Sequence, residues 1–147
     1  MPVHRIRLIG PWEFRWGELA GTPISADGSR VCPFETSGSV KMPCDWNSLF
    51  GLAGGQASFS RRFHRPTNLE SHEQVVIVLT GVGGSGTVML NGQLLSEFSE
   101  SSVSVEVNVT DRLQAFNVLE IGIHFHPSAE VARRGGMYDA VVLEIRS

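Results

Sequence analysis

The side chains best suited to chemistry are aromatic rings with polar neighbours, in segments expected to be loops. Trp46 lies between Asp45 and Asn47, and Tyr138 follows residues 133–137 (RRGGM). A sugar has flat C–H faces and hydroxyl edges, so its binding site needs an exposed aromatic ring surrounded by hydrogen-bonding groups. Trp46 has two interpretations, a sugar platform or a core residue beneath a long loop, and the sequence favours neither.

The histidines and cysteines offer metal-binding chemistry. His124 and His126 are two residues apart, which puts both imidazoles on one face of a strand. Such a pair can bind one metal ion, but zinc needs a third and usually a fourth ligand, and nothing fixes His64 or Glu120 in that role. We expect hydrogen-bonded or solvated histidines, no metal and no cofactor. The only two cysteines, Cys32 and Cys44, are too few for a zinc site, and we expect free thiols.

Signatures of hydrolytic and nucleotide-binding sites do not occur in the sequence. It contains neither Gly-x-Ser-x-Gly nor His-Glu-x-x-His, and we expect no catalytic residues. The run GVGGSG at residues 81–86 lacks the glycine spacing of a dinucleotide site, and a strand rather than a helix is expected after it. We therefore expect this run to be a hairpin connection.

The segments that must position these side chains are short strands. Apolar and polar residues alternate at 103–109, 119–125 and 141–145. Residues 75–79 are apolar at both odd and even positions, as in a strand covered on both faces. Asn91-Gly92 predicts a two-residue hairpin turn. Only residues 46–50 and 128–134 suggest helix, so the chain is expected to be an all-β antiparallel sandwich or barrel.

Composition limits the classes of partner. The chain has 147 residues, 41% of them hydrophobic, and a net charge of −3, which predicts one globular domain over residues 1–147. The mild acidic balance argues against nucleic-acid binding, and no apolar run is long enough to span a membrane. The first residues do not resemble a signal peptide, so we expect a cytoplasmic protein.

Five motifs occur in order along the chain: VKMPCDW at 40–46, FSRRF at 59–63 with Pro66 behind it, GV at 81–82 with VMLNG at 88–92, VNVTD at 107–111 with NVL at 117–119, and GGMY at 135–138 with VLE at 142–144. Together they resemble the N-terminal sugar-binding domain of glycoside hydrolase family two enzymes, which include β-galactosidases, β-glucuronidases and β-mannosidases. One departure is Asn108, where the family usually has Asp.

The resemblance implies a galactose-binding-domain-like jelly-roll sandwich. In the family, the catalytic acid and nucleophile lie on a separate barrel domain. The Asn-Glu dipeptide that marks the acid is missing from this sequence, so the resemblance implies a chain that is not catalytic alone. Loops of this domain help to wall the sugar pocket in relatives, and the matching positions fall near Asn47, Glu130 and Arg133.

Two functions follow as expectations. In the first, the chain is a non-catalytic carbohydrate-binding domain whose sugar site comprises Trp46, Asn47, Glu130, Arg133 and Tyr138. In the second, it is a structural or interaction domain that self-associates or docks to a separate catalytic chain. A compact stand-alone enzyme is the third and least favoured hypothesis.

Overall fold

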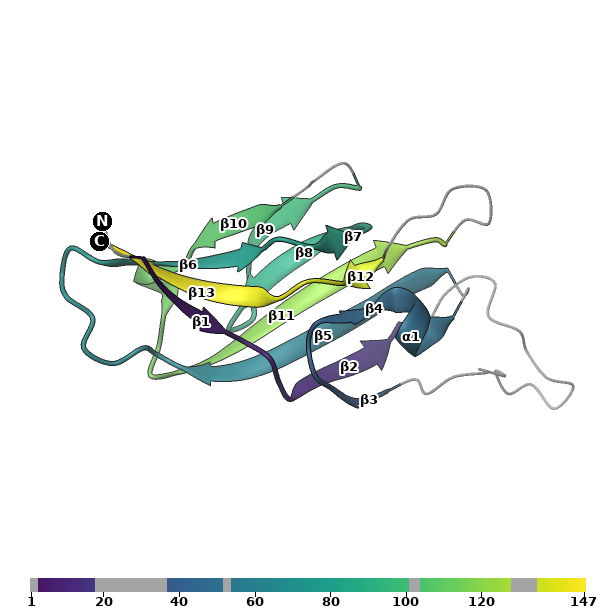
Figure 1. The fold of residues 1–147 in the computed structure, drawn as a ribbon, viewed down its shortest axis with the longest axis horizontal. Coiled ribbons are helices and arrows are strands. Elements are labelled where there is room, and N and C mark those ends of the chain that lie inside the picture. Colours follow the sequence, from purple (N-terminus) through teal and green to yellow (C-terminus); the bar gives the residue numbers. More distant parts are fainter. Residues whose placement is uncertain (1–2, 18–36, 52–53, 101–103, 128–134) are drawn as a thin grey trace, which may run out of the picture.

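Antiparallel strands dominate the computed structural model, which describes residues 3–17, 37–51, 54–100, 104–127 and 135–147 (Figure 1). A four-stranded sheet has the order β1 (Val3–Arg7), β13 (Val141–Arg146), β6 (Gln74–Leu79) and β10 (Val105–Asn108). A six-stranded sheet has the order β3 (Ser37–Val40), β2 (Trp12–Trp16), β5 (Gly55–His64), β11 (Phe116–Phe125), β8 (Ser85–Leu90) and β9 (Gln93–Phe98). The expected all-β antiparallel sandwich is confirmed.

Smaller elements lie outside these two sheets. A three-stranded sheet joins β4 (Cys44–Asp45), β12 (Gly136–Met137) and β7 (Val82–Gly83). The short helix α1 (Trp46–Phe50) follows β4 directly and matches the expected helical turn, and the 3-10 turn η1 (Thr110–Arg112) follows β10. The other expected helix, at 128–134, lies outside the described residues. No helix among the described residues is long and apolar enough to cross a membrane.

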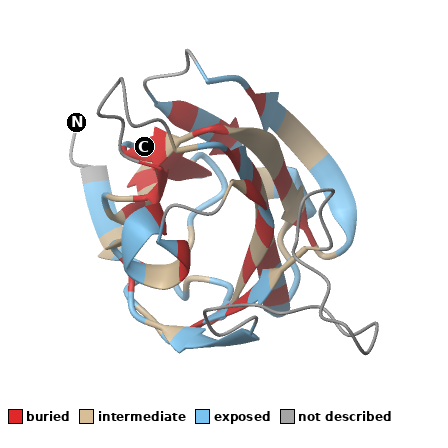
Figure 2. Cartoon of the chain, turned by 90° about the vertical axis from the view of Figure 1, so that its right-hand side faces the viewer, coloured by how far each residue is buried: buried red, intermediate tan, exposed pale blue. Residues whose placement is uncertain are grey.

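Apolar side chains that alternate along the strands fill the space between the two large sheets. The described residues at the apolar positions of the alternation in these three segments are buried: Val105, Val107, Val109, Leu119, Ile121, Ile123, Phe125, Val141, Leu143 and Ile145. Val142, at the opposite parity, is half-buried. Figure 2 shows buried positions on the inside of the sandwich and exposed positions outside. The period of two therefore sets which face of each strand enters the core.

The hairpin turn is where the sequence places it. Asn91 and Gly92 both have positive φ, 52° and 81°, as a type I′ turn requires, and they join β8 to β9.

The glycine-rich run 81–86 differs from expectation. A strand does follow it, but the run is no hairpin connection, because β6 and β8 belong to different sheets. The chain crosses from one sheet to the other through β7, and Gly84 has a φ of 101° at the crossing. The prediction failed because alternation in sequence does not reveal which strands pair.

Candidate functional site

Trp46 is a core residue in the structure. Its side chain is 0% exposed, and its ring lies 4.8 Å from that of Phe50 and 5.6 Å from that of Phe125, centroid to centroid. Its backbone N–H donates to the carbonyl of Gly135 at 2.9 Å. An indole with no exposed face has no surface on which a sugar can stack. The core interpretation of Trp46 therefore holds in this structure, and the platform interpretation does not.

The segments around Asn47 and Tyr138 lie side by side. Strand β4 pairs with β12, with Asp45 opposite Gly136 and Cys44 opposite Met137. Asn47 is exposed on α1, whereas Tyr138 is half-buried and its backbone N–H donates to the carbonyl of Gly81 at 3.0 Å. The segment near Asn47, which the resemblance assigned to a sugar pocket, thus lies beside the segment before Tyr138 at one end of the sandwich. Glu130 and Arg133 lie outside the described residues.

Asp45 begins α1 and affects its neighbour Cys44. The Asp45 carboxylate accepts from the backbone N–H of Ser48 at 3.2 Å, which satisfies one of the free donors at the start of the helix. Burial and the Asp45 charge raise the pKa of the Cys44 thiol, in that order of importance. Cys44 is a free thiol, as expected, and Cys32 lies outside the described residues. The raised pKa makes Cys44 a poor nucleophile near neutral pH.

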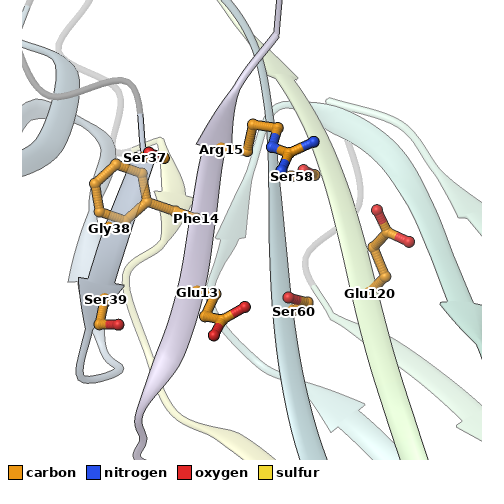
Figure 3. Close-up of a pocket in the computed structure, with 9 residues that line it drawn as sticks. All are labelled: Glu13, Phe14, Arg15, Ser37, Gly38, Ser39, Ser58, Ser60 and Glu120. Carbon is orange, nitrogen blue, oxygen red and sulfur yellow. The ribbon is translucent and has the colours of Figure 1, made fainter.

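A hollow of about 380 Å³ lies on the outer face of the six-stranded sheet (Figure 3). We call it the serine groove, and its lining comprises Glu13, Phe14, Arg15, Ser37, Gly38, Ser39, Ser58, Ser60 and Glu120. It crosses four neighbouring strands, β3, β2, β5 and β11. The longer polar side chains stand around small serines, and this difference in side-chain length makes the hollow.

The strand register explains which residues meet in the serine groove. Ser60 lies opposite Glu13 on one neighbouring strand and opposite Glu120 on the other. Residues directly opposite one another share a face of the sheet, so both carboxylates stand on the side of the Ser60 hydroxyl. Arg15 lies opposite Ser58 in the next outward-facing row.

The groups in the serine groove suit a ligand rich in hydroxyls. Carboxylates accept hydrogen bonds, the guanidinium of Arg15 donates them, and serine hydroxyls do both. Glu13 and Glu120 are two strands apart, and at about 4.8 Å per strand their backbones are separated by about 10 Å.

The serine groove was missed by sequence reasoning, although Glu120 was considered as a metal ligand. The available signal was the serine alternation at Ser58 and Ser60, opposite in parity to the apolar Ala57 and Phe59. Nothing in the sequence says that Glu13, more than forty residues earlier, pairs beside Ser60.

The histidine pair lies on the same sheet. The Nε2 atoms of His124 and His126 are 3.0 Å apart. His64 is not their partner, because it pairs with Phe116 at the opposite end of β11. The described residues contain no group of three or more His, Cys, Asp or Glu side chains that could hold a metal ion.

Beside the serine groove, the outer face of the six-stranded sheet carries solvent-exposed apolar side chains. Phe116 is 72% exposed, Leu94 52% and Val118 40%. Val118 and Glu120 are two residues apart on β11 and therefore share its outer face. Across the neighbouring strands, Glu120 lies opposite Met89 on β8, and Met89 lies opposite Leu94 on β9. We call Phe116, Val118, Met89 and Leu94 the apolar patch. Exposed apolar residues that adjoin on one sheet face mark a candidate contact surface.

Comparisons with known proteins agree with this architecture. Residues 50–137 match the family model described as "Glycosyl hydrolase 2 galactose-binding domain-like". Among solved structures, a β-glucuronidase from Bacteroides uniformis matches 98% of the chain at 20% identity with a TM-score of 0.72. A putative β-galactosidase from Bacteroides fragilis matches 99% at 20% identity with a TM-score of 0.71. No curated protein matches the chain.

The chain spans only part of these structures. It covers 18% of the Bacteroides uniformis enzyme and 23% of the Bacteroides fragilis protein. A β-glucuronidase from Bifidobacterium dentium, in complex with coumarin-3-O-glucuronide, matches 98% of the chain at 21% identity with a TM-score of 0.71, and 30% of its own length is covered. At these identities the likeness establishes the fold.

Proposed function

Because the chain belongs to the glycosyl hydrolase 2 galactose-binding domain-like family, we propose that it is a non-catalytic carbohydrate-binding domain. The observation that carries the proposal is the serine groove, in which two carboxylates, one guanidinium and four serine residues line one hollow. Hydroxyl groups of a sugar are matched by donors and acceptors of this kind. The cluster is solvent-facing, so a sugar can enter without any movement of the core.

The affinity is expected to be modest. A sugar exchanges hydrogen bonds with water for hydrogen bonds with protein at small net gain. At about −0.3 kcal/mol per non-hydrogen atom, a monosaccharide binds with about −4 kcal/mol, which is a Kd of about 1 mM. An oligosaccharide that reaches the neighbouring apolar patch adds buried area and binds more tightly.

The end of the sandwich that carries Asn47 and Tyr138 is the second proposed location of the sugar. The pairing of β4 with β12 supports it, because this pairing brings the segment before Asn47, which the family resemblance assigns to the pocket wall, beside the segment before Tyr138. The family resemblance adds Glu130 and Arg133, which lie outside the described residues, to this hypothesis. A test of the function must therefore report where the sugar binds as well as whether it binds.

Calorimetric titration with methyl β-D-galactoside and methyl β-D-glucuronide tests the function. Glu13→Gln and Glu120→Gln keep the side-chain size but remove the charge, and each is expected to weaken binding about tenfold or more, because a hydrogen bond to a charged group contributes about 1.5 kcal/mol or more. Glu97→Gln, an exposed carboxylate on β9, is the matched control. Loss of binding only in Asn47→Ala or Tyr138→Phe moves the site to the sandwich end. If titration with every saccharide gives no heat of binding, the proposed function is contradicted.

The apolar patch favours a second function, docking to another protein, either a second copy of this chain or a separate catalytic chain. Three of its four residues are more than a third exposed, and protein contacts are built around such surfaces. Sedimentation velocity tests self-association. A dimer that Phe116→Ser and Leu94→Ser convert to monomer supports it, and a wild-type monomer at all concentrations removes the self-association form of this proposal.

A further inference from the structure

We propose that His124 and His126 chelate one divalent transition-metal ion at the edge of the sandwich, with a preference for cupric ion. Both side chains project from the outer face of β11 and its continuation, and both are exposed. Their rings stand nearly perpendicular, at 88°, with centroids 4.6 Å apart. The two Nε2 atoms lie 3.0 Å apart, within hydrogen-bond distance. A neutral imidazole nitrogen is a metal ligand.

The separation of the two nitrogens fits a single ion. Imidazole nitrogens lie about 2.0–2.1 Å from a bound first-row metal. Two nitrogens 3.0 Å apart at that radius subtend an angle of about 91–97° at the ion. Tetrahedral coordination, with an angle near 109°, needs the nitrogens about 3.3–3.4 Å apart. The pair is therefore closer to the right-angle geometry of square-planar and octahedral ions.

An angle near 90° is compatible with square-planar and tetragonal coordination. Square-planar and tetragonal nitrogen and oxygen sites select Cu²⁺ or Ni²⁺, whereas zinc sites are tetrahedral. The general affinity order of divalent ions also places Cu²⁺ above Ni²⁺ and Zn²⁺. The described residues place no third His, Cys, Asp or Glu beside the pair, so the proposed site has two protein ligands among them. The affinity is correspondingly lower than that of a three- or four-ligand protein site.

Gly54 holds the second imidazole in place. A Cβ atom at Gly54 would lie 2.3 Å from Nδ1 of His126 and 3.1 Å from its Cγ. The ring therefore lies directly over the glycine, in space that any other residue would occupy. The first imidazole comes from a position paired on both sides, since His124 lies opposite Gln56 on β5 and Ser85 on β8. The backbone of one ligand is thus positioned by sheet pairing, and the ring of the other packs against Gly54.

Titration of the chain with CuCl₂, followed by calorimetry and by electron paramagnetic resonance, tests the proposal. The expected result is one ion per chain at the strongest site, with a spectrum of two coordinating nitrogens. His124→Gln and His126→Gln are each expected to weaken binding about tenfold or more, because the chelate becomes a single ligand. His64→Gln and His72→Gln, exposed histidines elsewhere, are the matched controls and leave binding unchanged.

Gly54→Ala provides a test that keeps both ligands. The added methyl displaces the His126 ring, so copper affinity is expected to fall by about tenfold, as it does when groups that orient a ligand are changed. Circular dichroism checks that each variant remains folded. The proposal is overturned if copper binds equally to His126→Gln, if the control variants lose as much affinity as the pair variants, or if Zn²⁺ binds as tightly as Cu²⁺.

Discussion

Arg146 reaches across strand β6 to form an ion pair with Glu106. Arg146 lies on β13 opposite Gln74, and Glu106 lies on β10 opposite Val78, so the pair passes diagonally over Val76. Val76 is 4% exposed although it faces outward from the four-stranded sheet. Long charged side chains with apolar stems cover such positions. This ion pair therefore helps to bury the outer face of a strand that has apolar residues on both of its faces.

The same network predicts an acid-sensitive loss of stability. Hydrogen bonds from Arg146 and then Arg5 lower the pKa of Glu144 below its ordinary value of 4.5. A carboxyl whose pKa is depressed on folding stabilises the native state above its unfolded pKa, and this contribution is lost as the pH falls through the folded value. Stability of the wild type should therefore drop more steeply below about pH 4.5 than that of Glu144→Gln.

Urea unfolding at pH 7 and at pH 3 measures this difference. The gap between wild type and Glu144→Gln should be large at pH 7, smaller at pH 3, and reduced by added salt. A gap that does not change with pH would show that the Arg5–Glu144–Arg146 contacts contribute nothing through charge.

Trp46→Ala should destabilise the protein by about 3–5 kcal/mol, because the side chain is fully buried and its removal leaves a cavity among aromatic rings. Urea unfolding measures the change. Asn47→Ala, one residue along the same helix and exposed, should remain within about 0.5 kcal/mol of wild type. Equal stability of Trp46→Ala and wild type is incompatible with a core role for the indole.

Asn117→Ala should cost about 1–3 kcal/mol, because Asn117 is 1% exposed and bonds to several groups that would lose their partners. Its Oδ1 accepts from the backbone N–H of Gln114 at 2.8 Å and from Asn91 at 3.1 Å, and its Nδ2 donates to the carbonyl of Gln114 at 2.9 Å. Thermal unfolding tests this. Asn108→Ala, an exposed asparagine, serves for comparison and should cost less.

Gly86→Ala should separate β8 from β11 or prevent folding, because a Cβ at Gly86 would lie 1.8 Å from the backbone oxygen of Gly122. The strands must move apart, and overpacking of this kind costs about 1–3 kcal/mol or more. Hydrogen exchange of the β8 and β11 amides reports the separation. Unchanged protection in Gly86→Ala would mean that the close approach of these strands is unnecessary, and the glycine would need another explanation.

The residues that could be predicted were those governed by local pattern. Leu119, Ile121 and Ile123 enter the core because a strand turns alternate side chains inward, and Asn91-Gly92 turns because both residues tolerate positive φ. Both features depend only on residues that are close together in the sequence.

The residues that could not be predicted depend on pairing between distant strands. Ser60 becomes the middle of the serine groove only because β5 pairs with β2 on one side and β11 on the other. The burial of Trp46 likewise depends on Phe125, far along the chain. From the sequence, an exposed Trp46 and a buried Trp46 were equally plausible. Only the tertiary packing shows which of the two is correct.

The position of a bound sugar tests the central claim most directly. We predict that nitrogen–proton NMR spectra of the chain, recorded during titration with methyl β-D-glucuronide, shift at Glu13, Arg15, Ser58, Ser60 and Glu120, on strands that are neighbours only in the folded sheet. Amides at the far face, such as those of β1, should not move. Spectra that stay unchanged to tens of millimolar sugar, about tenfold above the expected Kd, or shifts confined to Asn47 and Tyr138, would contradict the serine groove as the binding site.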